Sequence, residues 1–158
     1  MKILVISDSH GNTPACIQAV RLINPELILH LGDYDSDCAA ILREFPDIPI
    51  KAVKGNCDPT SNRPEALEFE AAGKKFFITH GHLHAVAATP NLIVAAAKSK
   101  NTDVALFGHT HNPCYEINDG TVLVNPGSIG RPRPPTGKKT YAVLEIKNGV
   151  VSCEIKEL

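Results

Sequence analysis

The sequence lacks tryptophan, has a single methionine and carries no excess of charge of either sign. Because the formal net charge is -1, the chain as a whole is not attracted to a polyanionic nucleic acid, and we expect no extended nucleic-acid surface. Long apolar runs are also absent: the run at residues 3–6 is too short for a signal peptide, and none approaches the length of a membrane-spanning helix. These absences indicate a soluble, cytoplasmic protein without membrane attachment.

Paired cysteines are missing as well. The cysteines are odd in number and form no CxxC motif, which argues against a disulfide framework and against a zinc knuckle. We expect most of them to be small, reduced core residues: Cys16, Cys38, Cys57, Cys114 and Cys153.

The composition is that of an ordinary globular protein. Hydrophobic residues make up 43% and charged residues 21% of the 158 residues, so disorder is not indicated. A chain of this length fits one domain, residues 1–158, and can bury roughly 70% of the surface that its unfolded form exposes.

The first half of the chain alternates between buried strands and helices. Short continuous apolar runs predict the strands, and the Asn12-Thr13-Pro14 segment predicts the start of the first helix. In chain order we expect a strand over 2–6, a helix to about 23, a strand over 27–31, a helix over 36–45 and a strand over 50–53. Such units predict parallel strands whose carboxyl ends form the ligand-binding edge of a sheet.

The second half is richer in turn signals. Gly73 between runs at 66–71 and 74–79, Asp119-Gly120 and Asn148-Gly149 each predict a hairpin, so we expect this half to be mostly antiparallel. A helix from Thr89-Pro90 to about residue 99 and a buried strand over 104–107 separate the first two hairpins. The simplest architecture for these elements is α/β, with two packed sheets flanked by helices.

Five short segments place side chains that can bind metal at the ends of predicted strands. They are Asp8-Ser9-His10, Gly32-Asp33, Gly55-Asn56, Thr79-His80-Gly81 and Gly108-His109-Thr110-His111. Two aspartates, one asparagine and four histidines form a set that two divalent ions sharing one bridging carboxylate would require.

Each segment taken alone also has a structural explanation. Asp33 suits the cap of the following helix, and Asn56 tolerates the dihedral angles of a tight turn. The ligand types are nevertheless complementary, and six of the seven histidines lie in these loops when His82 and His84, just after Gly81, are included. The joint pattern therefore favours a dinuclear metal site.

The order DxH, GD, GN, HG and GHTH is similar to the signature of calcineurin-like metallophosphoesterases. The match runs from Asp8 to His111, and Asn125-Pro126-Gly127-Ser128 resembles a later loop of the small single-domain phosphodiesterase branch. This resemblance implies a four-layer α/β/β/α sandwich of two mixed sheets. It also implies that one ion is held by Asp8, His10 and His111 and the other by Asn56, His80 and His109, with Asp33 as the bridge.

Such a centre would hydrolyse a phosphodiester. Two divalent ions and two carboxylates carry a net charge of +2, which attracts a small or nucleotide-like phosphodiester, and a hydroxide bridging the ions would attack it directly. Mixed imidazole and oxygen ligands favour transition metals over calcium or magnesium. We expect manganese first, with nickel, cobalt, iron or zinc as alternatives.

One departure from the wider family concerns the leaving group. Many members have a histidine after the asparagine of GN, where this chain has Cys57. Cys57 beside Asn56 is either a weak proton donor in catalysis or a packing residue. Without a strong general acid, substrates with good leaving groups are favoured.

Several further residues have more than one interpretation. His82 follows His80 at a spacing that puts both on one side of an extended backbone, which suits phosphate binding or support of the ligands. His84 fits a solvated surface position and His30 a satisfied interior one. Arg131 and Arg133 either meet a substrate phosphate or lie in a solvated loop.

Two other functions remain open at this level. The same branch includes a retromer coat subunit that acts through protein contacts, so a protein-binding scaffold is an alternative. A phosphomonoesterase is another, although the missing histidine would handicap it. The sequence leaves the oligomeric state open and is compatible with a homodimer.

Overall fold

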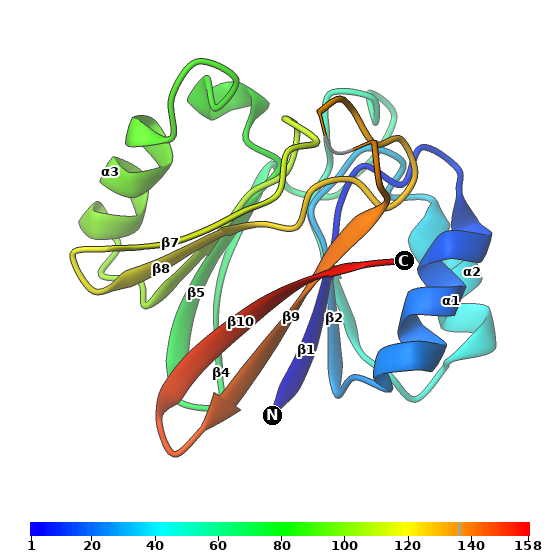
Figure 1. Ribbon diagram of the computed structural model, residues 1–158, viewed down its shortest axis with the longest axis horizontal. Coiled ribbons are helices and arrows are strands. Elements are labelled where there is room, and N and C mark those ends of the chain that lie inside the picture. Colours follow the sequence, from blue (N-terminus) through cyan, green and yellow to red (C-terminus); the bar gives the residue numbers. More distant parts are fainter. Residues whose placement is uncertain (136) are drawn as a thin grey trace.

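Two five-stranded sheets form the centre of the molecule. The computed structural model describes residues 1–135 and 137–158. The first sheet has the order β10-β9-β1-β2-β3, with β1 Lys2–Ile6, β2 Leu27–His30, β3 Ile50–Ala52, β9 Thr140–Lys147 and β10 Val150–Glu157 (Figure 1). The second has the order β4-β5-β6-β8-β7, with β4 Ala66–Ala71, β5 Lys74–Thr79, β6 Val104–Leu106, β7 Cys114–Asn118 and β8 Thr121–Asn125.

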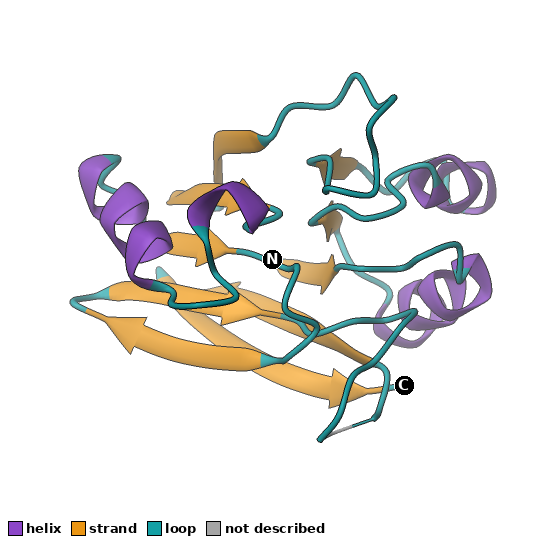
Figure 2. Ribbon diagram, turned by 90° about the horizontal axis from the view of Figure 1, so that it is seen from above, coloured by secondary structure: helices purple, strands orange, loops and turns teal. Residues whose placement is uncertain are grey.

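Helices cover the outer faces of both sheets (Figure 2). Helices α1, Thr13–Ile23, and α2, Asp37–Glu44, pack against the first sheet, and α3, Asn91–Ser99, packs against the second. The Asn12 side chain accepts a hydrogen bond from the backbone of Ala15 and caps α1, as its sequence predicts. The predicted four-layer α/β/β/α architecture is confirmed.

The apolar run of β1 is continuous because the strand is covered on both faces. Ile3 and Val5 point into the core between the sheets, whereas Leu4 and Ile6 point toward α1 and α2. All four side chains are fully buried. This alternation anchors the strand that leads directly into Asp8.

Each sheet contains a set of three parallel strands. In the first sheet β1, β2 and β3 are parallel, as predicted. In the second sheet β5, β6 and β8 are also parallel, which the expectation of a mostly antiparallel second half did not include. The predicted hairpins β4–β5, β7–β8 and β9–β10 are antiparallel.

The second parallel set arises from long-range pairing. Helix α3 returns the chain to the start of the second sheet, so β6 runs beside β5 in the same direction. Strand β7 then returns the chain again, so β8 runs parallel to β6. Apolar periodicity marks a strand but does not specify its partner. The consequence is that the carboxyl ends of β5 and β6 carry their histidines to one common edge.

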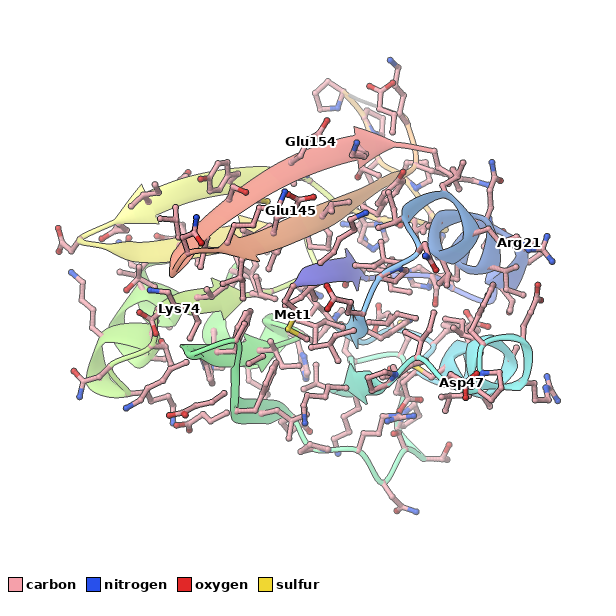
Figure 3. All side chains as sticks on the ribbon, turned by 90° about the horizontal axis from the view of Figure 1, so that it is seen from below. Met1, Arg21, Asp47, Lys74, Glu145 and Glu154 are labelled. Atoms are coloured by element: carbon pink, nitrogen blue, oxygen red, sulfur yellow. The ribbon has the colours of Figure 1, made fainter. Side chains whose placement is uncertain are left out.

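The end of the molecule opposite to these strand ends carries charged side chains. Figure 3 views this end and shows Met1 near the centre, with Lys74, Glu145 and Glu154 around it. The amino group of Met1 donates a hydrogen bond to the Ile146 carbonyl at 2.8 Å. Among the described helices, none is long and apolar enough to cross a bilayer.

We predict that Leu29→Ala lowers the free energy of unfolding by about 3 kcal/mol, because the side chain is fully buried between the two sheets. Leu22→Ala is the matched control, since Leu22 on α1 is 62% exposed and its truncation should cost less than about 0.5 kcal/mol. Urea denaturation measures both values. Equal losses in the two variants would contradict the described core.

Candidate metal centre

The candidate ligands lie in loops whose backbone is held in an uncommon conformation. The dihedral angle φ is positive at Asp8 (54°), His10 (45°), Asp33 (58°), His109 (68°) and His111 (60°). Left-handed conformations are unfavourable for residues with a side chain and persist where the surrounding structure imposes them, often at functional sites. The surrounding structure therefore holds these residues in a strained backbone conformation that sets the direction of their side chains.

Four of the candidate ligands form one tight group. Asp8, His10, Asp33 and His111 each offer an atom within 4.8 Å of the others. Nε2 of His111 lies 3.0 Å from Oδ1 of Asp8 and 3.4 Å from Nε2 of His10. These atoms come from the loops after β1, β2 and β6, so the parallel strands bring the group together.

The remaining candidate ligands form a second group beside the first. Nε2 of His80, after β5, lies 3.2 Å from Oδ1 of Asn56, after β3. The ring of His109 stands edge-on to that of His80, with 5.2 Å between their centroids. His80 is fully buried, whereas Asn56 is exposed at the mouth of the site.

Asp33 belongs to the first group and lies between its other members and the second group. Its Oδ2 is 3.7 Å from Nε2 of His10, and its Oδ1 is 3.4 Å from Nε2 of His80. The side chain is almost fully buried, and the backbone N–H of Cys57 donates a hydrogen bond to Oδ1 at 2.9 Å. One carboxylate thus presents a different oxygen to each group, an arrangement that suits a bridging ligand.

Backbone carbonyls fix the orientation of two imidazole rings. Nδ1 of His80 donates to the Leu31 carbonyl at 2.7 Å, and Nδ1 of His111 donates to the Arg131 carbonyl at 2.5 Å. A carbonyl can only accept, so in the neutral rings the proton sits on Nδ1 and the lone pair sits on Nε2. In their neutral forms both rings therefore point the Nε2 lone pair at a carboxylate oxygen, and a cation between the two atoms would relieve that repulsion.

A buried carboxylate oxygen provides an independent test of metal binding. Oδ1 of Asp8 is buried and has no hydrogen-bond partner among the described residues, although Nε2 of His111 is close. The other oxygen accepts hydrogen bonds from the Ser7 hydroxyl at 2.6 Å and the His109 backbone at 3.1 Å. An unpartnered buried oxygen facing imidazole nitrogens fits a metal ligand.

The protonation of these groups suits ligation. Burial alone would raise the pKa of Asp8, but the rings of His111 and His80 and the Ser7 hydroxyl lower it overall. Burial lowers the pKa of His10 more than Asp33 and Asp8 raise it, and burial together with His80 lowers the pKa of His109. Burial would also lower the pKa of His111, but contact with Asp8 raises it overall. The lowered pKa values of Asp8, His10 and His109 thus favour an anionic carboxylate and two neutral imidazoles, the forms that bind metal ions.

Two glycines allow the loops to approach one another closely. A Cβ on Gly55 would lie 2.2 Å from Oδ1 of Asp33, and one on Gly108 would lie 2.0 Å from Oγ of Ser7. Any side chain at these positions would displace a carboxylate of the site or its support. This explains physically why Asn56 and His109 each follow a glycine.

Asp58 supports the site from beneath and is a residue that the sequence interpretation missed. Its carboxylate is buried and accepts hydrogen bonds from the backbone of Tyr34 at 2.8 Å, Asp35 at 3.2 Å and Gly55 at 2.8 Å. It thereby ties the loop that carries Asp33 to the loop that carries Asn56. Its position two residues after the candidate ligand Asn56 is the sequence feature that could have pointed to this role.

Asn125 and Ser128 perform the same task for the other two loops. Nδ2 of Asn125 donates to the Gly108 carbonyl at 2.9 Å, and the Ser128 hydroxyl donates to the Asp8 carbonyl at 2.8 Å. Both residues are fully buried. The Asn125-to-Ser128 segment was recognised by resemblance, but its supporting role required the structure.

The histidines around β5 differ in part from expectation. His82 lies beside the second group, 5.4 Å from His80 between ring centroids, but it does so within a 3-10 helix, η1 His82–His84, rather than an extended backbone. The expected solvated position of His84 is wrong: the residue is half-buried and its ring packs edge-on against Phe77 at 5.9 Å. His30 is a satisfied interior histidine as predicted, with Ser9 and Gly32 as partners.

Cys57 and the two arginines lie at the rim. The Cys57 thiol is exposed, and partial loss of solvation together with Asp33 raises its pKa to about 11. Arg131 and Arg133 have exposed side chains; the carbonyl of Arg131 orients His111, whereas Arg133 lines a cavity next to His109.

The fold and the cluster of histidines and carboxylates together define an α/β/β/α protein with a candidate metal centre. The chain belongs to the calcineurin-like phosphoesterase superfamily, whose domain model matches residues 1–149. The resemblance inferred from the order of the motifs is thereby confirmed.

Relatives of known name cover most of this chain. A probable metallophosphoesterase of Bacillus subtilis, YsnB, is 34% identical over 94% of this chain and 86% of its own length. Phosphodiesterase MJ0936 of Methanocaldococcus jannaschii is 31% identical over 80% of this chain and 83% of its own length. Vacuolar protein sorting-associated protein 29 of Schizosaccharomyces pombe is 33% identical over 96% of this chain and 81% of its own length. A crystal structure of a predicted phosphoesterase from Streptococcus pneumoniae is similar with a TM-score of 0.83 at 27% identity, covering 99% of this chain and 88% of that one.

We predict that divalent ions stabilise the folded chain. At 100 times its Kd an ion adds about 2.7 kcal/mol to the free energy of unfolding, so saturating manganese or zinc should raise the Tm by roughly 5–10 °C. Asp8→Asn should abolish most of this rise, because it removes a buried ligand charge. Asp119→Asn, in an exposed hairpin turn, is the control and should keep it. An equal rise in the wild type and Asp8→Asn would mean that the ions bind elsewhere.

Proposed function

We propose that this chain is a metal-dependent phosphodiesterase with two divalent ions at the carboxyl edge of its parallel strands. One ion would be held by Asp8, His10 and His111 and the other by Asn56, His80 and His109, with Asp33 shared. The observation that carries the proposal is the position of Asp33, whose two oxygens face the two groups separately. Relatives named metallophosphoesterase and phosphodiesterase support it.

Two such ions would lower the pKa of a shared water, supply the nucleophile from it and offset the charge of the phosphate. The protein's contribution is orientation and charge. Neutral imidazoles and only two carboxylates leave the loaded site positive, so it attracts an anionic ester. Because both carboxylates are buried and hydrogen-bonded to the backbone or to Ser7, they keep their positions as the substrate arrives.

His82 is positioned to contribute on the substrate side of the second group. Its ring centroid is 6.2 Å from that of His109, and its Nε2 lies 3.7 Å from the Glu65 carboxylate. Glu65 in turn pairs with Lys54 at 3.1 Å, which restrains the carboxylate. We assign His82 to phosphate binding or to support of the ligands and Asn56 to ligation, with no role in proton transfer.

The expected preference for diesters follows from Cys57, the residue after Asn56. A thiol occupies the position where an imidazole could protonate the leaving group, so good leaving groups are favoured. Manganese is the metal expected first, with nickel, cobalt, iron and zinc as alternatives.

We predict that the manganese-loaded protein hydrolyses bis(4-nitrophenyl) phosphate with a higher kcat/KM than 4-nitrophenyl phosphate. Asp33→Asn should lower the diesterase value by more than about 100-fold, since it removes the shared charge. Asp119→Asn serves as the control. A faster monoester reaction would favour a phosphomonoesterase.

We predict that Cys57→Ser changes the same diesterase kcat/KM by less than about threefold, or about 0.65 kcal/mol in barrier. The thiol is exposed, accepts a hydrogen bond from the Asn56 amide at 3.4 Å and interacts with the Asp33 carboxylate, contacts that a serine hydroxyl can also make. Collapse to background with the metal content unchanged would assign Cys57 a direct catalytic role.

The relative named vacuolar protein sorting-associated protein 29 supports a second candidate, a protein-binding scaffold on the same fold. The intact set of seven candidate ligands favours the enzyme. A screen of diesters with manganese, nickel, cobalt, zinc and magnesium separates the two. If wild type and Asp33→Asn are equally inactive on every diester, the scaffold is the better interpretation.

A further inference from the structure

A cavity of about 410 Å³ opens beside the candidate metal centre. His109 belongs to both, because its ring faces His80 on one side and it lines the cavity. A phosphate held at the metal centre would therefore have the cavity within reach of its ester oxygens. Its volume lies in the range of small-molecule binding sites.

The cavity has a mixed lining, in which an apolar floor lies beside polar groups. Val86, Phe107 and Leu123 line it and are 6%, 4% and 1% exposed. They belong to the hydrophobic cluster beneath α3, so the floor is backed by well-packed side chains. Pro113 and Cys114 continue this surface toward the mouth.

The polar groups of the cavity offer little to a second charged group. Thr110 accepts hydrogen bonds from Asn125 at 3.0 Å and from the Asn112 backbone at 3.2 Å, so its hydroxyl is engaged by residues of the protein. Glu116 and Arg133 are the charged lining residues, both exposed and of opposite sign. The cavity thus suits an uncharged group with substantial apolar surface.

We propose that this cavity binds one organic substituent of the phosphodiester and prefers a flat, uncharged ring, such as a phenyl group or a nucleobase, over a short alkyl group. The proposal rests on the proposed function because it places the phosphate at the metal centre. A ring covers more of the apolar floor than a methyl group, which would leave that floor in contact with water. The cavity then defines the substrate class of the site.

The first test compares two phosphate monoesters that differ only in the substituent. Calorimetry on the zinc-loaded protein should show phenyl phosphate binding about tenfold more tightly than methyl phosphate, a difference of about 1.4 kcal/mol. Ala87→Phe and Cys114→Leu add bulk to residues that line the cavity, and at least one should reduce the ratio to below about twofold. Ala88→Phe changes an equally exposed neighbour that is not among the lining residues and should keep the tenfold ratio.

The second test needs neither metal nor phosphate. Phenol titrated into the metal-free protein should shift the methyl NMR signals of Val86 and Leu123, and the effective filling variant should suppress these shifts. Equal affinity of both esters for the wild type, or unchanged ratios in both filling variants, would overturn the proposal and leave the phosphodiesterase intact. If neither ester binds, the proposed function fails; the cavity proposal is then overturned if phenol does not shift those methyl signals.

Discussion

The carboxylate of Asp33 occupies the point where the two halves of the molecule meet, and the rest of the site depends on it. One of its oxygens faces His10 from the first sheet, and the other faces His80 from the second. In its neutral form the His80 ring points the lone pair of Nε2 at this carboxylate. Cations are the natural way to balance this arrangement, because burial denies the groups water.

Several hydrogen bonds hold these loops in fixed positions relative to one another. Three backbone N–H groups converge on Asp58, while Asn125 and Ser128 hold the loops after β6 and β1. The imidazole of His80 bonds to the Leu31 carbonyl, which joins the end of β5 to the end of β2 across the interface of the sheets. Left-handed backbone at five candidate ligands is tolerated because these contacts outweigh its cost. Rigid placement of this kind is what a site for charged ligands and an anionic ester needs.

Much of this could be read from the sequence. Continuous apolar runs indicate buried strands, and Asp and His at the ends of such runs indicate a common edge, so the sequence predicts residues such as Asp8 and His10 as ligands. The pairing of β5, β6 and β8 could not be predicted, because an apolar run does not specify which strand it pairs with. The 3-10 helix at His82 and the burial of His84 against Phe77 likewise depend on tertiary contacts. The role of Asp58 could not be predicted, because only the folded chain brings its three donors together.

The most direct test of the central claim is an anomalous diffraction map from crystals grown with manganese. Two peaks are expected, one among Asp8, His10 and His111 and one among Asn56, His80 and His109. Each peak should contact a different oxygen of Asp33. A single peak, or peaks that leave Asp33 without a metal contact, would contradict the assignment of Asp33 as the bridge between two ions.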